Sequence, residues 1–90
     1  MSDINRIAAM NVTNTTVTLL NSSTQKLIKT ILIGNSMETD QNLSLIIDNI
    51  QFMFTVPASN TLILDNPIAC SNITATATSL LGVHITGMNL

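Results

Sequence analysis

The side chains best suited to chemistry in this sequence are His84, Cys70 and the pair Glu38 and Asp40. A histidine that acts as a general base needs an orienting partner, and no acid or second histidine stands near His84 in the sequence. Its direct neighbours are apolar, which is typical of a residue on the outer side of a strand. His84 is therefore predicted to lie on a sheet face and not in an active site.

Cys70 is the single cysteine, so no internal disulfide can form. No cation stands near it in the sequence to favour the thiolate, and a buried, unreactive thiol is expected. Glu38 and Asp40 could contribute to a calcium site, but they lack the glycine-punctuated spacing of a binding loop. Solvated loop acids are the preferred interpretation. The sequence thus predicts no catalytic residue, no metal ligand, no cofactor and no small-molecule substrate.

The composition is unusual in its lack of charge. Of 90 residues, 9% are charged, against about 25% in an ordinary soluble domain. Ser, Thr and Asn take the place of the ionic residues and make up about a third of the chain. Such a surface is wet but costs little to desolvate against a partner. The composition therefore favours a protein that functions in an assembly.

Several other partners are not expected. Three cations and no Tyr or Trp cannot form a surface that follows phosphates and stacks on bases, so nucleic acid is not predicted as a partner. No apolar run approaches the ~20 residues of a membrane span. The first residues lack the basic start and apolar core of a signal peptide, so synthesis in a cytoplasm is expected.

The strongest structural pattern is a β-hairpin from Leu43 to Val56. Apolar and polar residues alternate along both arms, which is typical of strands with one buried face. Asp48 and Asn49 between the arms tolerate the positive φ of a two-residue turn. Phe52 and Phe54 are on the same side of the second arm and are predicted to lie in the core.

Further strands are predicted on both sides of this hairpin. The stretch Lys26–Ile33 is apolar on both faces, so we expect it to be central, and Asn21–Thr24 is predicted as the turn before it. The remaining predicted strands are Val12–Leu20, Thr61–Leu64, Ile68–Ser71, Asn72–Ser79 and Val83–Met88. Seven or eight short strands without a helix predict an all-β fold, an antiparallel β-sandwich or jelly roll.

Two segments are expected: an N-terminal arm over residues 1–10 and one β-sandwich domain over residues 11–90. The arm carries apolar residues at a spacing of three, which is compatible with one helical turn, with an extended strap on a neighbour or with a frayed end.

A domain this small cannot bury both faces of its sheets. Five apolar residues fall opposite the best core stripe: Ile28, Leu32, Ile46, Met53 and Ile63. Either the core is wider than predicted, or the second face meets another copy, and we favour the second. The residues predicted for this interface are Ile4, Ile7, Met10, Met53, Met88 and Leu90.

Three runs carry a resemblance to a known class of proteins. The strand Lys26–Ile33 ends in Gly34-Asn35-Ser36, and the chain closes on Val83-His84-Ile85-Thr86-Gly87-Met88. Between them, the run Pro57–Ile68 contains one turn that begins at Pro57-Ala58 and a second at Asp65-Asn66-Pro67-Ile68. From about Leu19 to Leu90 the sequence is similar to small β-sandwich virion proteins of tailed bacteriophages. In those proteins the turn that corresponds to Pro57–Asn60 usually has a glycine where this chain has Ser59.

The resemblance implies a non-enzymatic building block of a virion. The preferred role is that of a capsid decoration (cement) protein, which clusters as a trimer and binds the major capsid protein. An accessory ring of the neck or tail, with six-fold symmetry, is the alternative. A carbohydrate-binding module is the alternative from another class; it would need exposed aromatic side chains to stack on sugar rings.

Overall fold

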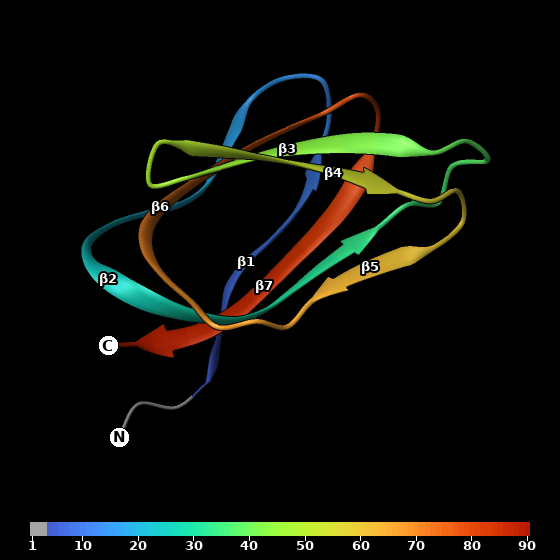
Figure 1. Ribbon diagram of the computed structural model, residues 1–90. Helices are drawn as coiled ribbons and strands as arrows, with labels where there is room; N and C mark the ends of the chain where they lie inside the picture. The colour runs from blue at the N-terminus through green and yellow to red at the C-terminus, as the bar shows by residue number, and fades with distance from the viewer. Residues whose placement is uncertain (1–3) are drawn as a thin grey trace.

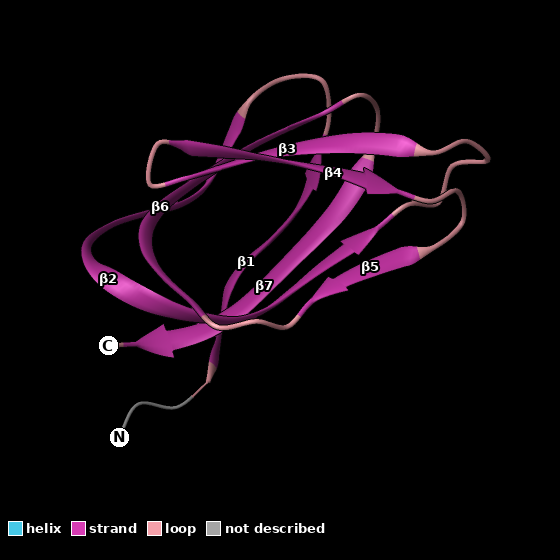
Figure 2. Cartoon of the chain, in the orientation of Figure 1, coloured by secondary structure: helices cyan, strands magenta, loops and turns pink. Residues whose placement is uncertain are grey.

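The computed structural model describes residues 4–90, and all regular secondary structure in this range is antiparallel β-strand (Figures 1 and 2). This confirms the predicted all-β class and the number of strands. The seven strands are β1 (Asn5–Val12), β2 (Val17–Gly34), β3 (Gln41–Ile47), β4 (Ile50–Val56), β5 (Thr61–Leu64), β6 (Ile68–Ala77) and β7 (Leu81–Asn89).

The strands form one hydrogen-bonded sheet in the order β1-β7-β2-β6-β3-β4, and β5 pairs with β2. The long strand β2 connects two halves of the sheet, because residues 17–21 pair with β6 and residues 30–34 pair with β7. In Figure 1 the β3–β4 hairpin lies across the half that contains β7, β2 and β5. Buried residues of both halves belong to one core cluster, an arrangement consistent with the predicted sandwich.

Alternation places the core residues as predicted in β3 and β6. Leu43 and Leu45 on β3 are fully buried, and Ile73, Ala75 and Ala77 on β6 are at most 4% exposed. Leu45 pairs directly with Ala75 across the two strands. Because consecutive side chains of a strand point to opposite faces, this register directs every second residue of both strands into the core.

The β3–β4 turn has the predicted geometry, with φ of 49° at Asp48 and 71° at Asn49. Asp48 also has a role that its turn propensity did not predict. Its Oδ1 accepts hydrogen bonds from the backbone N–H groups of Ser71 and Asn72, each at 3.0 Å, and its own N–H donates to the Asn72 carbonyl. The turn is thereby attached to the middle of β6.

The predicted turn at Asn21–Thr24 is wrong, because β2 runs without interruption over 18 residues. The irregularity is instead a shift in its register with β6 between Asn21 and Lys26. A second shift, against β7 between Ile28 and Thr30, changes the face on which the next residues lie. Ile28 is consequently buried at 1% exposure, and its assignment to the outer face is wrong.

The N-terminal segment is a strand of the sheet. The predicted boundary at residue 10 falls inside β1, which pairs with β7 from Asn5 to Val12. The first part of the arm, residues 1–3, lies outside the described residues. The predicted strand Val12–Leu20 is wrong over residues 13–16, which connect β1 and β2, whereas residues 17–20 are strand as predicted.

The side chain of Asn35 joins the loops at one end of the sheet by hydrogen bonds. It is 4% exposed, and its Nδ2 donates to the carbonyl oxygens of Thr39 and Val56 at 3.0 Å and of Pro57 at 3.2 Å. Its Oδ1 accepts from the Met37 N–H at 2.9 Å. One buried amide therefore holds the end of β2, the loop before β3 and the end of β4 together.

Candidate interaction surface

The residues that could do chemistry lie apart from one another. Within residues 4–90, no three His, Cys, Asp or Glu side chains are close enough to hold a metal ion together. His84 lies on the outer face of β7, between Ala9 of β1 and Leu32 of β2. Its Nδ1 is buried and has no hydrogen-bond partner in the structure. The side chain is where the sequence predicted it, on a sheet face.

Cys70 is fully buried, as predicted. Burial raises the pKa of its thiol above the ordinary value of 9.0, and the nearby carboxylate of Asp48 raises it further. Both effects favour the neutral thiol, which is a poor nucleophile.

Of the two loop acids, Asp40 has a clear structural partner. Its Oδ1 accepts a hydrogen bond from the Ala58 N–H at 2.9 Å. This contact connects the loop before β3 to the loop after β4, and it gives the carboxylate a role in fixing the backbone.

The notable surface feature is the distribution of charge over the strands. The cations Arg6, Lys26 and Lys29 are all on β1 and β2, and the acids among residues 4–90 are all in turns and loops. Strands β3 to β7 contain no Lys, Arg, Asp or Glu. Most of the sheet therefore presents hydroxyl, amide and apolar groups to its surroundings.

Exposed apolar side chains gather on β4. Ile50 is 60% exposed, Phe52 44% and Met53 62%. The prediction that Phe52 lies in the core is wrong, and Phe54 is only partly buried. Strand β4 forms an edge of the sheet, and no strand of the described chain pairs with its other side. The alternating pattern gives the direction of a side chain but not the extent of the layer beneath it.

An apolar groove of about 450 Å³ runs between β4 and β5. Phe52 and Phe54 line it from β4, Leu64 lines it from β5, and Ile31 lies among its lining residues from β2. Two polar residues, Asp48 and Asn66, also border it. The groove is the place where the core lacks a covering strand. We call it the β4–β5 groove.

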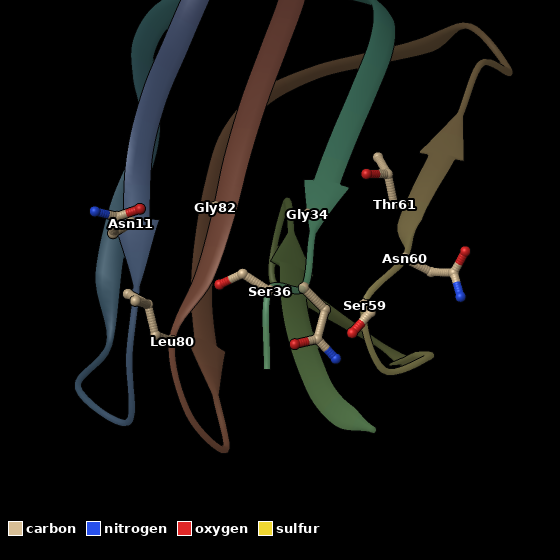
Figure 3. A pocket seen from close by; sticks show the side chains of 9 residues that line it. Asn11, Gly34, Ser36, Ser59, Asn60, Thr61, Leu80 and Gly82 are labelled. Carbon is tan, nitrogen blue, oxygen red and sulfur yellow. The ribbon is translucent and has the colours of Figure 1, made fainter. Parts of the chain in front are cut away.

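A second, polar depression of about 360 Å³ lies where β1 and β2 end and β5 and β7 begin (Figure 3). Gly34 and Gly82 face each other on β2 and β7, with Asn11 and Thr61 as their outer neighbours. Ser36, Ser59, Asn60 and Leu80 complete the part labelled in Figure 3. The lining offers hydrogen-bonding groups without charge and without an aromatic ring.

The six residues predicted for an interface lie in two separate places. Ile7 and Met10 are on β1, with Ile4 just before it, and Met88 is on β7, the strand that pairs with β1. Met53 is on β4, at the other end of the strand order. Ile4, Met53 and Leu90 are strongly exposed, whereas Ile7 packs against the core. Sequence reasoning missed Ile50 and Phe52, because their alternation assigned them to the core.

Comparison with known proteins adds no assignment. No protein-family model matches the chain, and no curated protein matches it significantly. Among the described residues, no helix is long and apolar enough to cross a membrane.

Proposed function

We propose that this chain is a non-enzymatic structural protein of a virus particle, which associates with copies of itself and decorates a capsid shell. The observation that carries the proposal is the combination of charge-free strands β3 to β7 with exposed apolar residues on β4 and β5. Ile63 on β5 is 58% exposed, close to the values of Ile50 and Met53. Such surfaces are typical of protein–protein contacts.

The physical reason is the low cost of covering this surface. Removing an ionised side chain from water costs several kcal/mol of free energy unless it is paired. A hydroxyl group costs less and is compensated by one hydrogen bond, and burying an apolar group is favourable. A uniformly uncharged face can therefore close a seam against a neighbour of low charge. The similarity of Leu19–Leu90 to small β-sandwich virion proteins supports a virion as the place of assembly.

The test is to purify virus particles from infected host cells and to identify their proteins by mass spectrometry. The proposal predicts this chain in many copies per particle, with density on the capsid surface by electron cryomicroscopy. Density in a six-fold ring at the neck or tail would favour the alternative location. Absence of the chain from gradient-purified particles would overturn the proposal.

The polar depression around Gly34 and Gly82 favours carbohydrate binding as a second candidate. Its amide and hydroxyl groups suit sugar hydroxyls. However, the one strongly exposed aromatic ring, Phe52, is on β4 and does not line this depression. A glycan array probed with the purified protein separates the candidates. A hit that is lost in the variant Asn11→Ala would support sugar binding at this place.

A further inference from the structure

Among residues 4–90 no strand pairs with the outer edge of β4, which leaves three pairs of backbone groups unused there. Ile47 and Ile50 close the two-residue hairpin and exchange both of their backbone hydrogen bonds. Because such pairs alternate along an antiparallel ladder, Phe52 and Phe54 also bond to β3. The N–H and C=O groups of Gln51, Met53 and Thr55 therefore point away from β3, toward the free edge.

The sequence of β4 is nearly the same when read in either direction from Met53. Phe52 and Phe54 flank it, Gln51 and Thr55 follow, and Ile50 and Val56 are at the ends. In an antiparallel pair related by a two-fold axis at residue 53, each of these residues faces one of the same polarity on the second copy. This pattern fits a second copy of β4 better than an unrelated strand.

We propose that β4 pairs antiparallel with β4 of a second copy, with Met53 opposite Met53 of that copy. In this register the outward-pointing groups of Gln51, Met53 and Thr55 meet those of Thr55, Met53 and Gln51 of the second copy. Each facing pair exchanges two hydrogen bonds. The inference rests on the proposed function in that self-association is part of it. It names the contact, and it gives a two-fold dimer where the resemblance implies a trimer.

The same contact covers the β4–β5 groove. Phe52 meets Phe54 of the second copy in a pair without hydrogen bonds, the kind in which side chains approach most closely. A two-fold axis perpendicular to the sheet keeps these rings on the face that lines the groove. The open sides of the two molecules thus face each other, and the 44% exposure of Phe52 decreases.

No charged residue of β4 opposes this pairing. Strand β4 contains no ionic residue, and the nearest acid, Asp48, is already bonded to Ser71 and Asn72 on β6. Natural edge strands usually avoid pairing by a charged residue or a proline, and β4 has neither. Its free edge is therefore competent to pair.

The first experiment measures the mass of the full chain by sedimentation equilibrium. We expect a dimer that the variant Met53→Lys weakens at least about tenfold, because two ammonium groups would then face each other. The matched control is Met10→Lys, the same substitution on the edge strand β1, which should leave the dimer intact. A monomer at all concentrations, or an oligomer that Met10→Lys breaks and Met53→Lys does not, would overturn the inference.

The second experiment tests the register by oxidation of single-cysteine variants. Facing residues in a hydrogen-bonded pair lie within the range of a disulfide, so Met53→Cys should cross-link rapidly to its own copy. Thr55→Cys faces residue 51 and should cross-link at least about tenfold more slowly. The native Cys70 is fully buried and does not compete. Equal rates in both variants would refute the register.

The failure of this inference differs from the failure of the proposed function. If neither Met53→Lys nor Met10→Lys changes the oligomer while the chain is found in purified particles, the β4 contact is wrong and the virion role stands. If the chain is absent from particles and the Met53→Cys cross-link forms, the contact is right and the virion role is wrong.

Discussion

Gly87 lies where the backbone of β7 passes close to the backbone of β2. A Cβ at this position would clash with the carbonyl oxygen of Leu27 and would come within 3.2 Å of the Cα of Ile28. Both are backbone atoms, which cannot rotate away as a side chain would. At Gly82 the nearest atom to such a Cβ would be the Asn11 Oδ1, at 3.8 Å, an ordinary contact. Glycine is therefore required by packing at Gly87 but not at Gly82.

The variant Gly87→Ala should lower the free energy of unfolding by about 2–3 kcal/mol, because β2 and β7 must separate to accept the methyl group. Gly82→Ala is the matched control on the same strand and should be neutral or stabilising by about 0.5 kcal/mol. Urea denaturation followed by circular dichroism measures both. Similar losses in the two variants would contradict this account of the close approach.

Asn35 is the second residue whose surroundings determine how much its substitution changes the free energy of unfolding. In Asn35→Ala the carbonyl oxygens of Thr39, Val56 and Pro57 lose their donor in a largely buried place. We expect a loss of about 3 kcal/mol in stability and a fall of at least about 10 °C in Tm. Asn60→Ala removes an exposed amide bonded to the Ala58 carbonyl and should change Tm little. Differential scanning calorimetry makes the comparison.

The buried thiol of Cys70 gives a pH dependence with a definite sign. Its pKa in the folded protein is above the ordinary value of 9.0, so the unfolded chain ionises first as the pH rises. The contribution to stability is fully present below pH 9.0 and is lost as the pH rises through the folded pKa. Urea titrations at increasing alkaline pH should show this loss in the native chain. The loss should be smaller in Cys70→Ala, and an equal loss in both would exclude the thiol as its source.

At the scale of elements, the β3–β4 hairpin is the part in which local and tertiary signals agree. The turn residues Asp48 and Asn49 adopt positive φ, and the alternation of β3 matches its burial. Strand β2 is the opposite case. Its polar stretch Asn21–Thr24 has the composition of a turn, yet β2 continues through it as strand, and residues 22–25 are skipped in its register with β6. The flanking residues are held by distant strands, since Asn21 pairs with Asn72 and Lys26 with Cys70, and they keep the stretch extended against its local propensity.

The turn offers a prediction at this scale. Asn49 has φ of 71°, a conformation that costs glycine nothing, and glycine is the preferred residue at this position of such a turn. Asn49→Gly should therefore stabilise the protein by about 0.5 kcal/mol, and Asn49→Val should destabilise it by at least about 1 kcal/mol. Thermal unfolding of the two variants tests both signs. A stabilised valine variant would mean that the turn geometry is different.

At the scale of the whole molecule, the important property is the separation of charge from most of the sheet. All strand cations are on β1 and β2, while β3 to β7 have none. Ordinary surface contacts include ion pairs, which salt screens. A contact made by β4 and the β4–β5 groove contains no such pair. Its strength should depend on apolar burial and backbone hydrogen bonds.

Self-association should accordingly be insensitive to ionic strength. Raising the sodium chloride concentration from about 50 mM to about 500 mM should change the dimer Kd by less than about threefold, whereas ionic contacts would be screened over this range. Sedimentation equilibrium at both concentrations measures the change. A Kd that rises about tenfold or more would show that charged residues of β1 and β2 form the contact.

The sequence by itself determined the secondary structure class, the β3–β4 hairpin with its turn, the central place of Lys26–Ile33 and the burial of Cys70. These features depend on the alternation of neighbouring residues and on local turn chemistry, which a sequence shows directly. Only the tertiary structure decided that Ile28 is buried, that residues 5–10 join the sheet and that Phe52 is exposed. The reason is that register shifts, strand partners and the extent of the opposite layer are set by contacts between residues far apart in the chain.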